Sequence, residues 1–161
     1  MAKTIYISGP ITDLSTGLPR IGWKQEFIDA ESKLRLMGFQ AINPVDIARE
    51  VEYEYRRQGE YTPFPIAGQN CAGEQALPTR ADYIMACLQK MNDEAKAGRL
   101  HGMYVIGDYY DVLISHGVQM EILMADVLNL PIYAKHRDDL RIDRSLMPMD
   151  HYGTIEELLN S

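Results

Sequence analysis

Short apolar runs rich in β-branched residues alternate along the chain with longer segments whose apolar side chains recur at helical spacing. The run Thr4–Ser8 is β-branched and aromatic, and Gly9-Pro10 ends it, which is typical of a buried strand in a parallel sheet. Helical spacing predicts a helix over 23–37. Residues 39–42 then predict a second strand, ended by Asn43-Pro44 because proline lacks an N–H and restricts the residue before it. This opening segment therefore predicts a βαβ unit.

The segment over 45–79 is the least regular part of the sequence. A charged stretch over 50–58 precedes a region with three prolines and two glycines between positions 63 and 78. We expect a short helix and then a long surface loop, with a loop insertion over about 56–79. Loops longer than about 12–15 residues in compact domains are often lids over a site. This one is either such a lid or a surface insertion that takes no part in function.

The second half of the chain continues the alternation of helix and strand. The last predicted helix of this part is apolar almost all round, as expected of a buried helix. In order, we expect a helix over 81–98, a strand over 103–106, a loop over 107–114, a helix over 115–128 and a strand over 132–134.

Strands that alternate with helices predict a single α/β domain over 1–161, because parallel strands need crossover connections that return the chain to the same end. We expect a three-layer, flavodoxin- or Rossmann-like parallel sheet with helices on both faces. A charged C-terminal extension over about 135–161 includes a capping box at 154–157, which predicts a final helix. In such sheets ligands bind at the carboxyl ends of the strands, which indicates 8–12, 43–46 and 107–121 as candidate positions.

The acidic composition narrows the expected partners. The formal net charge is −7 and the pI is about 5.0, whereas nucleic-acid polymers are bound by clustered Lys and Arg. The apolar runs are far shorter than the roughly 18–20 residues that cross a bilayer, so no membrane partner is expected. We expect a small-molecule ligand, which can be anionic because backbone amides at a helix N-terminus bind phosphate.

Cysteine, histidine and glycine positions give no sign of a disulfide framework, a metal or a cofactor. Cys71 and Cys87 stand apart, without a CxxC pair or a signal peptide, which indicates reduced thiols in a cytoplasmic protein. The four histidines lack metal-ligand spacing. Gly9-Pro10 is neither a GxGxxG nor a P-loop sequence, so no metal and no cofactor is predicted.

Glu121 is the strongest candidate for chemistry, because it is a charge among apolar neighbours over 118–124. Burying a carboxylate costs several kcal/mol unless it is paired, so Glu121 has a function, has a salt-bridge partner or lies on a solvent-facing stripe. Ser115 and Gly117 open the same helix and either cap and pack it or bind a ligand. Asp82 opens the preceding helix, where the helix dipole favours an acid in any case.

Three groups of residues together resemble the nucleoside 2-deoxyribosyltransferase superfamily. They are Ile5-Tyr6-Ile7-Ser8-Gly9-Pro10-Ile11, the pair Asn43-Pro44, and Ser115-His116-Gly117-Val118-Gln119-Met120-Glu121 followed by Ala125 and Leu130-Pro131-Ile132. The resemblance spans about residues 4–134 and depends on the order of these pieces and their places at strand ends.

The resemblance implies a glycosyl-transfer site in a protein that is commonly a homo-oligomer, here a dimer or larger. The residue matching Glu121 attacks C1′ of the sugar or stabilises its cationic transition state, and the tyrosine matching Tyr6 holds that carboxylate. Asp82 is the candidate for the acid that protonates the departing base. The implied substrate-binding residues are Ser8, Gly9, Pro10, Ile11, Asn43, Ser115 and Gly117.

Two departures from the superfamily bear on the substrate. Ser115 stands where transferases of free nucleosides have an aspartate, and it resembles the serine with which related nucleoside 5′-monophosphate N-glycosidases bind phosphate. Thr12 stands where those glycosidases have an arginine, for which Arg20 or Arg80 are the candidate substitutes. We expect hydrolysis or transfer at the N-glycosidic bond of a nucleoside 5′-monophosphate. The alternatives are a 2-deoxyribosyltransferase of free nucleosides, a non-catalytic nucleotide-binding sensor, and an interaction protein whose apolar helices serve oligomerisation.

Overall fold

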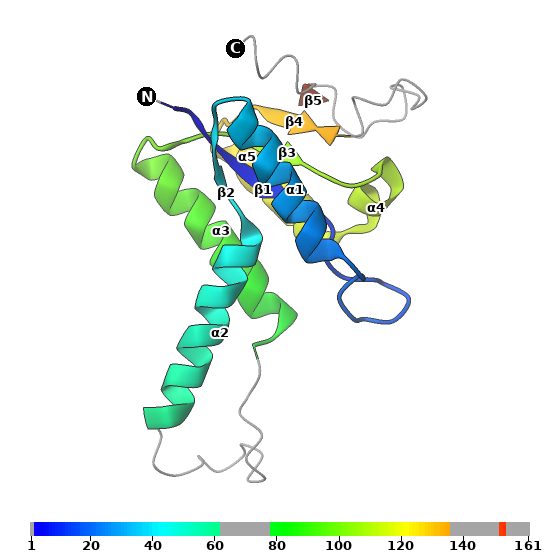
Figure 1. The fold of residues 1–161 in the computed structure, drawn as a ribbon, viewed down its shortest axis with the longest axis vertical. Coiled ribbons are helices and arrows are strands. Elements are labelled where there is room, and N and C mark those ends of the chain that lie inside the picture. Colours follow the sequence, from blue (N-terminus) through cyan, green and yellow to red (C-terminus); the bar gives the residue numbers. More distant parts are fainter. Residues whose placement is uncertain (1, 62–77, 136–151, 154–161) are drawn as a thin grey trace.

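The computed structural model describes residues 2–61, 78–135 and 152–153, and these form a parallel sheet flanked by helices (Figure 1). The sheet has the strand order β2-β1-β3-β4-β5, and every neighbouring pair is parallel. The strands are β1 (Thr4–Ser8), β2 (Gln40–Ile42), β3 (Leu100–Val105), β4 (Ile132–Ala134) and β5 (Tyr152–Gly153). The helices are α1 (Trp23–Leu36), α2 (Pro44–Tyr61), α3 (Arg80–Lys96), α4 (Tyr109–Ile114) and α5 (His116–Val127).

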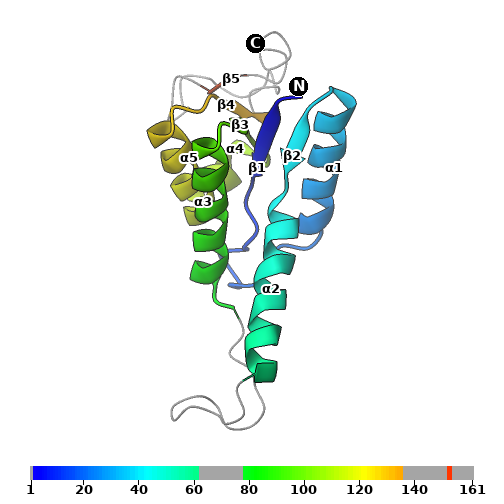
Figure 2. The ribbon, with the colours of Figure 1, turned by 90° about the vertical axis from the view of Figure 1, so that its left-hand side faces the viewer.

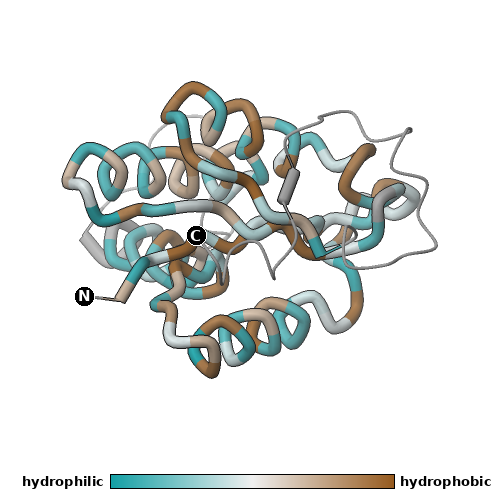
Figure 3. Tube along the Cα trace, turned by 90° about the horizontal axis from the view of Figure 1, so that it is seen from above, coloured by the Kyte–Doolittle hydropathy of each residue, from teal (hydrophilic) through white to brown (hydrophobic). Residues whose placement is uncertain are grey.

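The side chains of β1 alternate between the two faces of the sheet. Ile5 and Ile7 pack against α1 in one apolar cluster, whereas Tyr6 belongs to a second cluster beneath α3 and α5. Figure 2 shows α1 on one side of the strands and α3 with α5 on the other. The helices alternate between hydrophilic and hydrophobic colours in Figure 3, as expected of helices that bury one side. The expected three-layer α/β fold is confirmed.

The strand order places a topological switch point beside β1. The chain leaves β1 for β2 on one side, and then crosses over to place β3 on the other side. Register pairs Tyr6 with Ile42 of β2 and with Met103 of β3, so β1 lies in the middle of three well-paired strands. In sheets of this order ligands bind at the carboxyl end of the strands flanking such a switch point.

The boundaries of β1, α1, α3, α5 and β4 follow the predicted pattern to within one or two residues. Gly38 has a φ of +90° directly after the cap of α1, a left-handed conformation that a side chain disfavours, and this ends the helix where the sequence predicts.

Three expectations of local structure are wrong. The helix after β2 is not short, because α2 continues for 18 residues and its end replaces the first part of the expected loop over 56–79. Asn43 caps it, Pro44 occupies its first turn, and Ile47 and Val51 pack on the core, while the described charged residues other than Glu52 are exposed. The expected loop over 107–114 contains α4. Helix α5 is not buried all round, because Leu123 is 63% exposed.

The C-terminal extension enters the described structure only as β5, which the sequence pattern does not predict. Cys71, residues 62–77 of the 56–79 insertion and the capping box at 154–157 lie outside the described residues. Across 2–61 and 78–135, none of the helices has the length and apolarity to cross a membrane.

Candidate active site at the carboxyl end of the sheet

A cavity of about 480 Å³ lies at the carboxyl end of β1, beside the switch point. Its volume falls in the range of small-molecule sites, roughly 300–1,000 Å³. In Figure 2 the lower part of α2 extends past the ends of the strands, so that helices rather than strands form this part of the wall. The lining residues are Gly9, Ile11, Thr12, Gly17 and Pro19 from the loop after β1, Trp23, Lys24 and Phe27 from α1, Pro44, Ala48 and Glu52 from α2, Pro78, Arg80, Tyr83, Ile84 and Cys87 from the α3 segment, and Ser115, Gly117 and Glu121 from the α5 segment.

Glu121 lines the cavity, and Tyr6 and Ser8, which were predicted for the site, lie fully buried beneath it and outside the lining; we call this cluster of three residues the floor. Tyr6 and Ser8 are two residues apart on β1 and therefore share one face of the strand, the face that α5 covers. Ser8 Oγ donates a hydrogen bond to Glu121 Oε1 at 3.2 Å. Three residues that the sequence predicts for the site, on two elements far apart in the chain, thus lie together.

Glu121 has a buried carboxyl group whose two oxygens differ in their hydrogen bonds. Its side chain is 8% exposed, and its Oε2 has no hydrogen-bond partner among the described residues. Burial raises the pKa of Glu121 from 4.5 to about 7, against the opposing effects of the Tyr6 and Ser8 hydroxyls. An acidic group with a pKa near neutrality at the floor of a cavity is a common feature of catalytic sites.

Tyr6 and Cys87 lie beside this carboxyl group and are both uncharged. The Tyr6 hydroxyl is fully buried and completes no hydrogen bond within the described residues, and burial together with the Glu121 charge raises its pKa well above the usual value. Burial, followed by the Glu121 charge, raises the pKa of Cys87 to about 12. Because only a thiolate is an effective nucleophile, Glu121 rather than Cys87 is the nucleophilic candidate.

Ser115 and Gly117 line the cavity at the N-terminus of α5. The Ser115 side chain caps the helix by accepting from the Val118 N–H at 3.3 Å. That bond uses a lone pair of the hydroxyl oxygen and leaves its O–H available to a ligand. The nearest atoms to a Cβ added at Gly117 are those of Ile84 at 3.7 Å, an ordinary contact, so packing does not explain this glycine.

The loop after β1 divides into residues that face the cavity and residues that hold the loop. A Cβ on Gly9 would lie 2.5 Å from Cγ1 of Ile106, so a glycine is needed for the loop to pack on the segment after β3. Gly9 and Ile11 line the cavity, whereas Pro10 is buried and is not part of the lining. The Pro10 carbonyl accepts from Arg20 Nη1 at 3.2 Å, which ties down the end of the loop.

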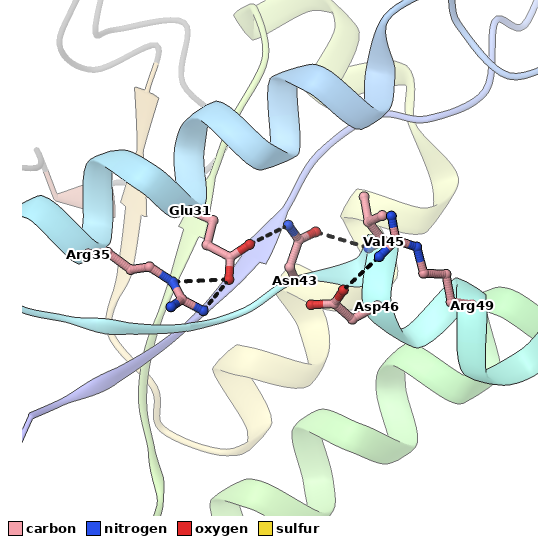
Figure 4. A network of polar contacts seen from close by, with 6 residues as sticks. All are labelled: Glu31, Arg35, Asn43, Val45, Asp46 and Arg49. Atoms are coloured by element: carbon pink, nitrogen blue, oxygen red, sulfur yellow. Dashed lines mark hydrogen bonds and ion pairs between the residues drawn. The ribbon is translucent and has the colours of Figure 1, made fainter.

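Asn43 is a helix cap, as Figure 4 shows, and it is not among the residues that line the cavity. Its Oδ1 accepts from the Val45 N–H at 2.9 Å, which caps α2, and its Nδ2 donates to Glu31 at 3.0 Å. The Asn43-Pro44 pair therefore has a structural explanation that does not require a ligand.

Asp82, the predicted acid, likewise caps a helix, α3. It forms a capping box with Thr79, and its Oδ2 accepts from the Tyr55 hydroxyl at 2.7 Å. The Tyr55 bond, followed by those of Thr79, lowers the pKa of Asp82. A carboxylate stabilised in this way is a weak proton donor, and Asp82 is not among the cavity-lining residues.

Sequence reasoning missed the contributions of α1 and α2 to the wall. Trp23 and Phe27 form an edge-to-face pair with ring centroids 5.9 Å apart, and Lys24 lies over the Trp23 ring. Pro44, Ala48 and Glu52 line one stripe of α2 at a spacing of four residues. That spacing is visible in the sequence, but only once the segment is known to be a long helix.

Of the two arginines predicted as substitutes at the site, Arg80 lines the cavity and has no ion-pair partner within the described segments. Arg20 already contacts the Pro10 carbonyl, Glu26 at 3.5 Å and Asp111 at 3.9 Å. Among the described residues there is no cluster of His, Cys, Asp and Glu suited to a metal ion. Comparison of the chain with models of known protein families, with curated proteins and with solved structures found no match.

Proposed function

We propose that this protein cleaves the N-glycosidic bond of a nucleoside 5′-monophosphate, by hydrolysis or by transfer, with Glu121 as nucleophile. The observation that carries the proposal is the state of Glu121: a buried carboxyl group with Oε1 held by Ser8 and Oε2 unpartnered, at the floor of a nucleotide-sized cavity. The resemblance of the β1 and α5 segments to the nucleoside 2-deoxyribosyltransferase superfamily supports the same assignment.

In this mechanism the Glu121 carboxylate attacks C1′ while the base departs with the bonding electrons. The attack requires the carboxylate form, which the pKa of about 7 makes available at neutral and higher pH. Ser8 fixes Oε1 by a hydrogen bond, and Tyr6 borders the carboxylate from β1. Water or an acceptor base then releases the sugar from the enzyme.

The phosphate end of the substrate is assigned to the N-terminus of α5. Ser115 O–H and the unpaired N–H groups of the first turn favour an anion, and Arg80 and Lys24 add positive charge to the same cavity. An aspartate at position 115, as in the free-nucleoside transferases, would repel a phosphate. These features favour a 5′-monophosphate over a free nucleoside.

A panel of nucleosides and 5′-monophosphates, in ribose and deoxyribose forms, tests the proposal by release of free base. We expect release from at least one monophosphate, with a rate that rises with pH through about 7 as Glu121 ionises. Release from nucleosides alone would favour the transferase alternative. Saturable binding of a monophosphate without release of base would favour the sensor.

We also propose that the protein acts in the cytoplasm as a homo-oligomer of at least two copies. The described thiol, Cys87, is free, which fits a reducing compartment. Helix α5 exposes the apolar stripe Met120, Leu123 and Val127, which a second copy would cover. Sedimentation should show Leu123→Glu with a lower mass than the wild type, and Leu36→Glu, at a 90% exposed leucine on α1, with the wild-type mass. A monomeric wild type would contradict the proposal.

A further inference from the structure

Departure of a base from C1′ needs a proton as well as a nucleophile. Most bases leave poorly as anions, so an acid on the side opposite the nucleophile is required. Asp82 accepts three hydrogen bonds from Thr79 and Tyr55, has a lowered pKa and is not part of the cavity lining. The proposed function therefore lacks its acid unless another residue supplies it.

Glu52 lines the cavity, whereas Asp82 does not. It lies on the stripe of α2 that lines the cavity, eight residues after Pro44 and hence about 12 Å further along the helix axis. Within the described lining, Glu52 and Glu121 are the two acidic side chains. They bound the same cavity from α2 and from α5.

Tyr83 gives the two oxygens of Glu52 different roles. The Tyr83 hydroxyl donates to Glu52 Oε1 at 3.2 Å, and none of the described residues is recorded as a partner of Oε2. Burial, and then the nearby Glu52 charge, raises the pKa of Tyr83, so its phenol stays protonated and remains a donor. A neutral Glu52 carboxyl group in this pair has its carbonyl oxygen at Oε1 and its O–H at Oε2.

We propose that Glu52, positioned by Tyr83, protonates the departing base. This inference rests on the proposed function and adds to it the identity of the acid. As Glu121 forms its bond to C1′, the C1′–N bond breaks with its electron pair moving to the base, and the Oε2 proton of Glu52 passes to that base. In hydrolysis the resulting Glu52 carboxylate takes a proton from the attacking water, whose oxygen bonds to C1′ as Glu121 is released.

Two leaving groups separate the role of the acid from that of the nucleophile. One substrate is the 5′-monophosphate that the panel identifies. The other is a 4-nitrophenyl 5-phosphofuranoside of the same sugar, whose 4-nitrophenolate departs without protonation and is measured by absorbance. Loss of the acid slows only the first reaction, whereas loss of the nucleophile slows both.

For Glu52→Gln we expect kcat on the monophosphate to fall by about 10²–10⁴-fold, and release of 4-nitrophenolate to stay within about threefold of the wild type. The retained nitrophenolate reaction shows at the same time that the variant is folded. Tyr83→Phe should show the same selectivity, with a smaller fall in kcat on the monophosphate and release of 4-nitrophenolate close to the wild-type rate.

Equal loss on both substrates, or no loss on either, would overturn the assignment of Glu52. Selective loss on the monophosphate in Asp82→Asn, with Glu52→Gln unaffected, would return the role to Asp82. Failure of the wild type to release base from any substrate of the panel would instead remove the proposed function itself, and the inference with it.

Discussion

The floor and the far wall of the cavity are built in different ways. Tyr6, Ser8 and Glu121 form the floor, on a strand and a helix that are both packed into the core. The wall around Glu52 and Tyr83 belongs to α2 and α3, where both helices carry exposed charged residues, and Asp82 lies outside the lining. The floor holds one carboxyl group in place by burial, whereas the wall carries Glu52, which accepts a hydrogen bond from Tyr83. Under the proposed function, burial distinguishes the nucleophile, Glu121, and a place in the cavity lining distinguishes the acid, Glu52.

The largest expected effect is that of Glu121→Gln on turnover. The amide keeps the volume and can retain the Ser8 contact, but it cannot attack C1′ or stabilise a cation as a charge, so kcat should fall by about 10²–10⁴-fold or more. Glu54→Gln, at an exposed site on α2, is the control and should behave as the wild type. Base release by Glu121→Gln at the wild-type rate would mean that the carboxyl group of the floor is structural.

The same variant should be more stable than the wild type at alkaline pH. Folding raises the pKa of Glu121 from 4.5 to about 7, so the stability that its neutral form contributes is complete below pH 4.5 and is lost as the pH rises through 7. Glutamine does not titrate. The free energy of unfolding measured with urea should therefore be up to about 3 kcal/mol higher for Glu121→Gln than for the wild type at pH 8, and nearly the same at pH 4.5. If this difference in the free energy of unfolding did not change with pH, the Glu121 carboxyl group would be in contact with water rather than buried.

Substitution of Ser115 should change which ligand the protein binds rather than the stability of the protein. Aspartate is as good an N-cap as serine, so Ser115→Asp should keep α5 intact while placing a negative charge beside the proposed phosphate site. We expect affinity for the monophosphate to fall about 10- to 100-fold, with affinity for the nucleoside unchanged. Calorimetry in the Glu121→Gln background measures both ligands without turnover. A parallel fall in both affinities would argue against phosphate at this helix end.

The smallest effect is expected at the capping box that opens α3. Thr79→Ala removes the side chain that caps α3 and should lower the free energy of unfolding by about 1 kcal/mol. Because Asp82 keeps its bond from Tyr55, kcat should stay within about threefold of the wild type. A large loss of activity with little loss of stability would show that this end of α3 takes part in the chemistry.

The sequence predicted the floor better than the wall for a physical reason. A strand has a period of two, so an apolar β1 dictates that Tyr6 and Ser8 share a face, and a charge inside an apolar helix stands out at Glu121. In α2 a charged residue is the ordinary occupant of an exposed helix, so nothing distinguished Glu52 from Glu50 or Glu54 before the partner helix was placed. Only the packing of α2 on α3 separates them.

Hydrogen-bond partners explain the other differences. Asn43 was predicted to contact a ligand from its position after β2, but asparagine before proline is equally the signature of an N-cap with proline in the first turn, and Asn43 serves in that way. Asp82 was predicted as an acid from the resemblance, yet its place at the start of a helix is also the one that a capping box uses. In both cases local backbone bonding accounts for the residue that the family pattern had singled out.

The most direct test of the central claim is to trap the bond that Glu121 is proposed to form. The protein is mixed with the cleaved monophosphate, quenched with acid within the first turnovers and digested, and the peptide containing 116–127 is weighed by mass spectrometry. The account predicts an added mass equal to one sugar phosphate, located on Glu121 and absent from Glu121→Gln. Base release from a wild type whose 116–127 peptide never gains that mass, or an adduct on another side chain, would contradict it.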